Sequence, residues 1–396
     1  MAKQDFIDGF LEWSENTPSP PIFRLWSAIT CIAGALERRV WVKALSKPTY
    51  ANLFTLLVAS PGVGKGIIDD AHWLWSEVKK LHIAPDSTSA ASMLDSLGEA
   101  KRIFMNGSAL PYEYHSLAVA AEEFGVFLPS HDNEFLSRLN TIFTNPERAF
   151  RVRRKYIKEE ISILRPNITI LAGSQPGYLM SLLPEEAWVM GFTQRLLLVH
   201  ASEGPSPELF TEEPDREDRG LALVSAIREM TDLYGLVPWE PAAADFLRQW
   251  DLAGGPPKPK HIRLMHYCKR RTQFMLKLML ISAISRRQPP TVIVPFDFTR
   301  ALMWLTNAEK TMPDVFREMT AKSDTYILQE LLQHVFLIYI KDKKPVHRSR
   351  CMYFLSERAP SERVPKLLEV AEQSGFLTRV EGDCYIPRRD PGQELQ

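Results

Sequence analysis

Apolar and polar residues follow patterns that change from one region of the chain to the next. In residues 1–50, apolar positions recur at helical spacing over 6–11 and 22–35, and the run 38–44 alternates as a strand does. Between residues 51 and 201, short β-type apolar runs alternate with helically periodic segments. This alternation predicts an α/β domain built on a mostly parallel sheet, with the first fifty residues as a helical lead-in.

The second half of the chain is predicted to be mainly helical. Residues 202–219 are rich in proline and acidic side chains and are expected to form an exposed linker, and a helical region follows over 220–321. The last region, 322–396, holds three helical segments and a hairpin that turns at Gly382 and Asp383, which together predict a winged helix-turn-helix. The three helices are expected over 324–341, 347–357 and 361–373, and the hairpin over 376–387.

Composition narrows the class of protein without indicating a partner. The 396 residues are 45% apolar and 24% charged, and 48 basic residues balance 48 acidic ones, so only local patches can indicate nucleic acid. Four widely separated cysteines show no paired metal spacing, which is typical of a reduced, cytosolic chain. No apolar run approaches the about 20 residues of a membrane span, so we expect neither export nor a membrane anchor.

Segment 53–67 is the most informative one, because an apolar strand runs into a glycine-rich turn that ends in Gly-Lys. Backbone N–H groups of such a turn bind phosphate, the lysine reaches the β- and γ-phosphates, and the next helix presents its positive end. We therefore expect ATP, with Mg²⁺, at this loop. Gly66 stands where a serine or threonine hydroxyl normally contacts Mg²⁺, which puts hydrolysis in question. The predicted ligand-binding residues are Pro61, Gly62, Val63, Gly64, Lys65, Gly66 and Ile67.

Hydrolysis also needs an acidic site on a neighbouring strand, and the run 117–124 supplies one. Glu122 is predicted to hold Mg²⁺ through water, although aspartate is usual there, and Glu123 to orient the attacking water. The alternative is that both glutamates are solvated side chains at a helix start, where acids are favoured. Asp69 and Asp70 are expected to lie on the helix after the loop, beyond reach of the metal.

Two polar positions accompany further strands. The strand 168–174 is followed by Gln175, where a residue that senses the γ-phosphate is expected, with Ser174 as the second choice. Arg195 stands at the mouth of a very apolar run, and an arginine there can stabilise charge on the transferring phosphoryl group, commonly across a subunit interface. The alternative for Arg195 is a buried structural arginine paired with an acid.

Four motifs follow one another along the chain: a strand with Pro-Gly-Val-Gly-Lys, then Ala-Glu-Glu-Phe, Ala-Gly-Ser-Gln-Pro and Gly-Phe-Thr-Gln-Arg. With the motifs in this order, the chain resembles AAA+ ATPases of the helicase-type branch. Over about residues 50–201, the chain is more closely similar to helicase-like replication ATPases of phages and plasmids, whose pattern also includes an element like segment 82–97. The resemblance implies a ring, expected to be a hexamer, that acts on DNA. The roles it implies are phosphate contact for Lys65, metal and water binding for Glu122 and Glu123, sensing for Gln175, and an arginine finger acting on a neighbour for Arg195.

Basic side chains gather in two further regions. Residues 148–158 hold six of them, interleaved with aromatic rings, and helicase-type rings often place a DNA-gripping hairpin here; a solvated basic helix is the alternative. In the tail, basic residues on the third helix and the wing are expected to meet duplex DNA, although winged helices also dock proteins. The predicted DNA contacts are Arg148, Arg151, Arg153, Arg154, Lys155, Lys158, Arg363, Lys366 and Arg379.

These features predict one fold and three alternative functions. The fold is α/β, with a P-loop AAA+-type ATPase core, flanking helical regions and a C-terminal winged helix-turn-helix. The leading hypothesis is an ATP-dependent DNA motor, a phage or plasmid replicative helicase that works with replication proteins in the cytoplasm of a bacterial host. The second is a helicase loader or replication initiator whose degenerate site binds ATP but hardly hydrolyses it. The third is a small-molecule phosphotransferase, since adenylate-kinase-like loops also carry Gly-Lys-Gly, although threonine follows there and Ile67 follows here.

Overall fold

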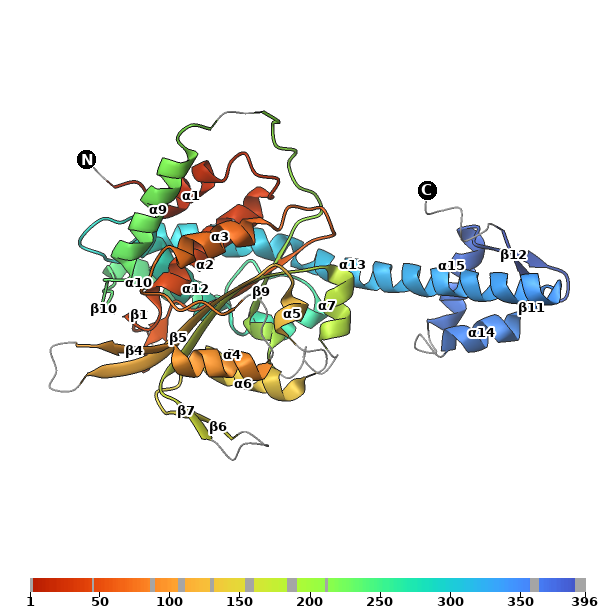
Figure 1. The fold of residues 1–396 in the computed structure, drawn as a ribbon, viewed down its shortest axis with the longest axis horizontal. Helices are drawn as coiled ribbons and strands as arrows, with labels where there is room; N and C mark the ends of the chain where they lie inside the picture. The colour runs from red at the N-terminus through yellow and green to blue at the C-terminus, as the bar shows by residue number, and fades with distance from the viewer. Residues whose placement is uncertain are drawn as a thin grey trace. The chain divides into compact units, whose positions relative to one another are not determined.

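The computed structural model describes residues 3–44, 46–85, 90–105, 111–128, 132–153, 160–183, 191–210, 213–356 and 363–388. The chain is a mixed α/β protein (Figure 1) that divides into two compact units, Met1–Phe316 and Arg317–Gln396. Within the described ranges, no helix combines the length and the apolar character needed to cross a membrane.

A five-stranded sheet lies at the centre of the first unit. Its strands, in spatial order, are β4 (Lys101–Phe104), β5 (Tyr112–Ala121), β8 (Pro166–Ser174), β3 (Phe54–Val58) and β9 (Leu196–His200). The last four run parallel, as predicted, and the edge strand β4 runs antiparallel to β5. The register pairs Val58 with both Ser174 and His200, so the carboxyl ends of β3, β8 and β9 meet at one edge of the sheet.

Helices cover both faces of this sheet (Figure 1). Phe54 and Thr55 point to opposite faces because side chains alternate along a strand. The Thr55 hydroxyl lies 2.8 Å from that of Thr30 on α2 (Pro21–Leu36), whereas the ring of Phe54 lies against Phe143 at the end of α6 (Asn133–Phe143). The two helices therefore cover opposite faces, and α2, which the sequence places in the lead-in, forms part of the core.

The helix that follows the glycine-rich turn, α3 (Ile67–Ser76), is anchored on α2. Trp75 of α3 is fully buried, and its indole N–H donates a hydrogen bond of 3.1 Å to the carbonyl oxygen of Cys31. Gly34 makes this contact possible, because a Cβ at that position would lie 2.6 Å from the Trp75 ring. The position of the turn thus depends on a helix that precedes it by some thirty residues.

The remaining elements of the first unit surround this core. The strands β6 (Phe150–Arg153) and β7 (Glu160–Ile163) form a separate hairpin beyond the sheet (Figure 1), and α4 (Ala90–Glu99) packs on β7. The predicted linker is shorter than expected, because α9 (Arg216–Met230) already begins at Arg216.

The other elements are α1 (Phe6–Trp13), β1 (Val40–Val42), β2 (Thr49–Tyr50), α5 (Phe124–Phe127), α7 (Pro176–Leu182), η1 (Thr193–Arg195), β10 (Gly235–Leu236), α10 (Pro241–Leu252), η2 (Ile262–Leu264), α11 (Met265–Cys268) and α12 (Arg271–Ser285).

A single long helix, α13 (Pro295–Asp342), includes the boundary between the two units. The sequence pattern predicts a helical region up to residue 321 and a separate helix over 324–341, and this prediction of two elements is wrong. Residues 314–341 contain neither glycine nor proline, so no residue of that stretch ends the helix.

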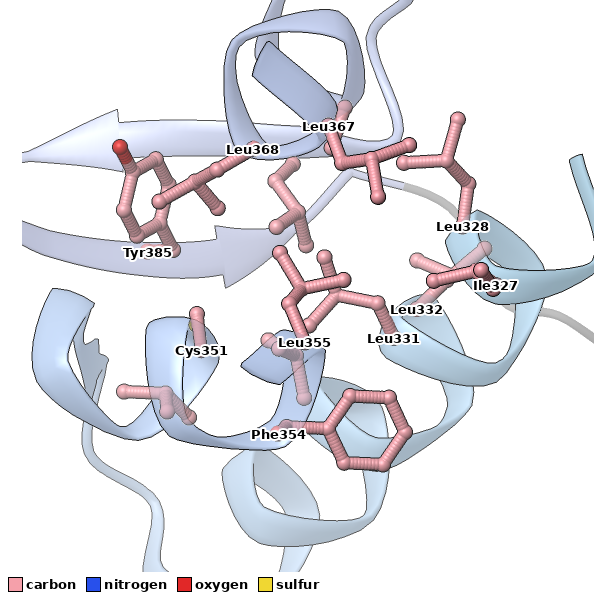
Figure 2. Close-up of a cluster of buried hydrophobic side chains, with 14 of the residues drawn as sticks. Ile327, Leu328, Leu331, Leu332, Cys351, Phe354, Leu355, Leu367, Leu368 and Tyr385 are labelled. Atoms are coloured by element: carbon pink, nitrogen blue, oxygen red, sulfur yellow. The ribbon is translucent and has the colours of Figure 1, made fainter. Parts of the chain in front are cut away.

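The second unit closes around an apolar core of its own (Figure 2). After α13 it contains β11 (Val346–His347), α14 (Arg348–Ser356), α15 (Val364–Gln373), β12 (Leu377–Val380) and β13 (Cys384–Pro387). Leu331 of α13, Leu355 of α14 and Leu367 of α15 meet in this core, beside an antiparallel sheet in the order β11-β13-β12. The predicted helices over 347–357 and 361–373 and the predicted hairpin are therefore present, and Gly382 and Asp383 make its turn with positive φ angles of 79° and 53°.

Candidate nucleotide site and nucleic-acid surfaces

The glycine-rich turn between β3 and α3 leaves open the space that a phosphate group would need. Gly62 and Gly64 adopt φ angles of 83° and 27°, a region that glycine enters without strain. A Cβ built on Gly62 or on Gly66 would meet no atom within 4 Å, and both residues are exposed, as is Pro61. The turn is not filled by side chains.

Three backbone donors of this turn have no acceptor among the described residues. In the part of the chain that the structure describes, the N–H groups of Gly62, Gly64 and Gly66 donate to no protein atom, whereas the Val63 N–H donates within the turn to Ser60. Such a set of N–H groups ahead of a helix fits a phosphate-sized anion. Ile67 differs from its neighbours, because its side chain is 1% exposed and belongs to the core. Only the backbone of Ile67 can therefore contact the ligand.

The segment before α2 packs over the same turn. A Cβ on Gly64 would lie 2.0 Å from the carbonyl oxygen of Pro18, and the Ser19 hydroxyl donates a hydrogen bond of 2.6 Å to the Gly64 carbonyl oxygen. Gly204, after β9, also lies close to Pro18, with a built Cβ 2.6 Å from the same oxygen. The turn is therefore held from outside by residues that no motif in the sequence indicates.

Lys65 and the acidic end of β5 lie at the same edge of the sheet. The Lys65 ammonium is half-buried and donates to the Ala59 carbonyl oxygen at 3.4 Å. The pKa of Glu122 is raised, first by burial, then by the charge and hydrogen bond of Asp69 and by the charge of Glu123, while the charge of Lys65 opposes these effects. Lys65, Asp69, Glu122 and Glu123 thus form one electrostatic cluster.

The expectation that Asp69 lies beyond reach of the predicted metal site is wrong, because the Asp69 carboxylate is close enough to Glu122 to raise the pKa of that carboxyl group. Asp69 follows Gly66 by three residues, which is one turn of α3, and this spacing is the signal that could have found it. Asp70 turns elsewhere, with a carboxylate oxygen 3.9 Å from Arg216. Within the described residues, no group of three or more histidine, cysteine, aspartate and glutamate side chains is arranged to hold a metal ion.

The two glutamates after β5 are not used as a helix cap. Glu123 occupies the N-cap position of α5, but its side chain makes no capping hydrogen bond, and Glu122 before it is exposed. Gly173 of β8 lets the chain pass close to Glu122, because a Cβ there would lie 2.2 Å from the Glu122 carbonyl oxygen. This tight approach fixes the backbone of the acidic pair against the strand that leads to the predicted sensor.

Gln175 stands between the loop strand and the acidic strand, because β8 lies between β3 and β5. The Ala59 N–H donates to the Ser174 carbonyl oxygen at 3.1 Å, which joins the ends of β3 and β8. Ser174 is buried and its hydroxyl donates to the Gln175 carbonyl oxygen at 3.4 Å. The half-buried Gln175 amide makes no hydrogen bond to the described residues, so of the two it is the side chain available to a ligand.

Arg195 lies at the opposite edge of the sheet from the loop. It precedes Leu196, which pairs with Phe54 at the start of β3, whereas the loop follows Val58 at the other end. At about 3.3 Å per residue, five residues of strand separate Arg195 from the loop edge by about 16 Å. The guanidinium donates to the Gly191 carbonyl oxygen, and no carboxylate among the described residues pairs with it, contrary to the structural alternative.

The basic segment 148–158 forms strands, not a helix, where the structure describes it. Arg148 is exposed before β6, and Arg151 is exposed on β6 opposite Ser162 of β7. Val152 is 8% exposed on the other face of the hairpin. Arg153 pairs in register with Glu160 at the end of the described ladder. Three further predicted contacts, Arg154, Lys155 and Lys158, lie outside the described residues.

The predicted DNA contacts of the tail sit at the start of α15 and on β12. Lys366 is exposed on the first turn of α15, and Arg363 is half-buried at its N-cap. Arg379 is exposed but is ion-paired with Asp383 at 2.5 Å, and the same carboxylate lies 3.7 Å from Arg348. An acid in the hairpin turn thus neutralises part of the basic surface.

The structure brings four of the five predicted catalytic residues to one sheet edge and leaves the fifth at the other. Lys65, Glu122, Glu123 and Gln175 follow the carboxyl ends of three adjacent strands, whereas Arg195 precedes a fourth.

No protein-family model matches this chain, and no match is found among curated proteins.

Proposed function

We propose that the chain is an ATP-dependent motor on DNA, with an AAA+-type core that assembles into a ring as a phage or plasmid replicative helicase does. The observation that carries the proposal is the meeting of an open glycine turn, Lys65 and the Glu122 carboxylate at one sheet edge. Phosphate, metal and attacking water have to come together at such a place for phosphoryl transfer.

Each residue at this edge has a role that follows from its position. The N–H groups of Gly62, Gly64 and Gly66, together with the Lys65 ammonium, would hold the β- and γ-phosphates. Glu123, whose carboxylate does not cap α5, would orient the water and accept its proton. The Gln175 amide, which bonds to none of the described residues, would sense the γ-phosphate. Bound Mg²⁺ would neutralise phosphate charge.

The pair formed by Glu122 and Asp69 would hold the metal in place of the missing hydroxyl at Gly66. Mg²⁺ usually takes one or two carboxylates together with phosphate oxygens and water, and this pair supplies two. Their proximity, which raises the pKa of Glu122, fits a site that gives up a proton when a cation binds.

The position of Arg195 supports a ring. Its guanidinium is too far from the loop of its own chain to reach a phosphate there, so a second copy would have to supply the phosphate. A heterologous contact of this kind, repeated from copy to copy, forms a ring when the rotation between copies closes.

DNA contact is proposed for two surfaces. The β6–β7 hairpin carries exposed arginine ahead of and along β6, and hairpins of this kind present basic side chains to a strand of DNA. In the second unit, three helices and a three-stranded sheet fit a winged helix-turn-helix, with Lys366 on its third helix and Arg379 on the wing.

The test is ATP hydrolysis with and without single-stranded DNA. Wild type should hydrolyse ATP faster when DNA is added, and Lys65→Ala should lose about 100-fold or more of the rate because phosphate binding and charge stabilisation are removed. Lys79→Ala, which changes an exposed lysine in the turn after α3, is the matched control and should behave as wild type. Equal rates for wild type and Lys65→Ala would overturn the proposal.

A second candidate function is favoured by Gly66. Without a hydroxyl at this position, the site could retain ATP as a structural ligand while the second unit recruits DNA, as in a helicase loader or initiator. Tight binding of ATP by wild type, lost in Lys65→Ala and accompanied by no turnover on DNA, would support this function over the motor.

A further inference from the structure

A second arginine lies beside Arg195. Arg270 is the N-cap of α12, and its Nε donates a hydrogen bond of 3.2 Å to the side-chain oxygen of Gln194, the residue before Arg195. Another guanidinium nitrogen of Arg270 is held by Gln273 at 3.0 Å. Neutral acceptors therefore fix both guanidinium groups within one small region at the amino edge of the sheet.

This region has positive charge without an acid to balance it. Among the described residues no carboxylate pairs with Arg195 or Arg270, and the Arg195 Nε is buried without a hydrogen-bond partner. Lys277, fully buried behind them, donates to the amide oxygen of Asn52 and not to an acid. Burial and the neighbouring charge of Arg270 lower the pKa of Arg195 to about 10. Clustered cations of this kind are stabilised when an anion binds, because the anion offsets their mutual repulsion.

The next residue shows what a structural arginine looks like in the same helix. Arg271 is 2% exposed and binds both oxygens of Glu309, at 2.6 and 2.8 Å. Arg270, one residue earlier, is only half-buried and has no such partner. Arg271 is therefore a structural arginine, whereas the Arg270 guanidinium is available to a ligand.

The surface beside the arginines exposes apolar side chains together with the lysines Lys258, Lys260 and Lys269. Ile262 is 81% exposed and Met265 is 56% exposed, and the short helix α11, which begins at Met265, packs against η1, which carries Arg195. Exposed apolar side chains favour contact with another protein surface, and the lysines add to the positive charge that an anion would meet. An anion that is bound to a protein partner fits both features of this surface.

We infer that Arg270 acts together with Arg195 as a two-arginine clamp for the nucleotide phosphates bound by a second copy of this chain. This inference rests on the proposed function, because the phosphates are those held by the Lys65 loop. The sheet register requires that they belong to another copy, since the clamp and the loop of one chain lie at opposite edges. Arg270 lies outside the motif that indicated Arg195.

The experiment mixes two defective proteins. Arg270→Gln should bind a fluorescent ATP analogue as wild type does, assemble less in ATP by sedimentation velocity, and lose about 100-fold in ATP hydrolysis. Lys65→Ala has the opposite defect, an inactive loop with an intact clamp. In an equimolar mixture, about a quarter of ring interfaces pair an intact loop with an intact clamp, so hydrolysis should recover well above either protein alone.

Controls separate folding from function. Lys269→Gln changes the exposed neighbouring charge and should leave binding, assembly and hydrolysis unchanged. Arg270→Lys keeps the charge but not the planar fork, and it should fall between Arg270→Gln and wild type. Each variant should melt within a few degrees of wild type.

The outcomes distinguish the inference from the function on which it rests. If wild type binds no ATP, the proposed function fails and the inference fails with it. If wild type binds ATP and Lys65→Ala does not, but Arg270→Gln assembles and hydrolyses normally, only the inference is overturned. Loss in Arg270→Gln without recovery in the mixture would likewise overturn it, because the arginine would then act within its own chain.

Discussion

The Ser19 hydroxyl donates a hydrogen bond of 2.6 Å to the Gly64 carbonyl oxygen, and the Pro18 carbonyl lies over the same glycine. The residues just ahead of α2 therefore fix the shape of the candidate phosphate loop from outside. Because α2 also carries α3 through Trp75, the start of the chain holds both ends of the loop. The loop is a part of the core architecture and not a surface turn that could be altered freely.

A side chain at position 64 should destabilise the protein, whereas a side chain at position 66 should be tolerated. Gly64→Ala would put a Cβ 2.0 Å from backbone at a positive φ, so we expect a loss of about 2 kcal/mol or more in the free energy of unfolding and loss of ATP binding. Gly66→Ala meets no atom within 4 Å at an ordinary helical φ of −60° and should change stability by less than about 0.5 kcal/mol. Urea denaturation measures both, and equal losses would contradict the contact with Pro18.

The carboxyl pair of Asp69 and Glu122 should give stability a specific pH dependence. The raised pKa of Glu122 means that its contribution to stability is present below its unfolded pKa and is lost as pH rises through the folded pKa. Asp69→Asn removes the largest cause after burial, so the variant should lose less stability than wild type between about pH 4 and pH 7. The difference should stay below about 1 kcal/mol because Glu122 is exposed to solvent.

Chemical denaturation without divalent cations, at a series of pH values, measures this effect. Glu77→Gln, at the C-cap of the same helix, removes an exposed acid and should leave the pH profile of wild type unchanged. Identical profiles for Asp69→Asn and wild type would show that the two carboxyl groups do not interact in solution.

The same pair should determine how much Mg²⁺ the site needs. If Asp69 takes the place of the missing hydroxyl, Asp69→Asn should raise the Mg²⁺ concentration for half-maximal ATP binding about 10-fold. Adding the hydroxyl as Gly66→Ser in the Asp69→Asn background should recover much of this loss, since the space around Gly66 is open. Calorimetric titration of ATP at several Mg²⁺ concentrations gives the comparison. A Gly66→Ser change that helps wild type and the Asp69→Asn variant equally would mean that Asp69 does not substitute for it.

Much of the candidate site follows from local sequence. The apolar run of β3, the glycines that need positive φ at positions 62 and 64, and the acids that follow β5 are short-range patterns, and the structure places them as the patterns indicate. A strand, a turn and a helix start are set largely by neighbouring residues, so the amino-acid order is enough to locate them.

The contacts that complete the site could not be predicted in this way. Ser19 and Gly64 are 45 residues apart, and Arg270 and Gln194 are 76 residues apart. No periodicity links such pairs, because their meeting depends on strand order and on which helix covers which face. Asp69 is the exception, since its place about one helical turn after Gly66 follows from the sequence alone.

Arg271 and Glu309 should be essential to the fold of the first unit. Both are nearly fully buried, and the Tyr267 hydroxyl also donates to Glu309 at 2.9 Å. Arg271→Ala leaves a buried carboxylate without its cation and should cost about 3 to 5 kcal/mol in the free energy of unfolding. The double variant Arg271→Met, Glu309→Leu should recover most of this loss because no charge remains to be compensated. Equal instability of the single and double variants would indicate that packing, not charge, dominates the site.

Asp383 should restrain DNA binding by the second unit. Its carboxylate engages Arg379 at 2.5 Å and lies 3.7 Å from Arg348, so phosphate must compete with it for both arginines. Asp383→Asn keeps a residue that accepts the positive φ of 53° and should raise affinity for duplex DNA several-fold. The slope of log affinity against log salt should steepen by up to about one, as expected for one more phosphate contact. Glu381→Gln, an exposed acid in the same turn that pairs with neither arginine, makes the same change in net charge and should have a smaller effect. Equal gains for the two variants, measured by fluorescence anisotropy across a salt series, would assign the effect to net charge and remove Arg379 from the DNA contacts.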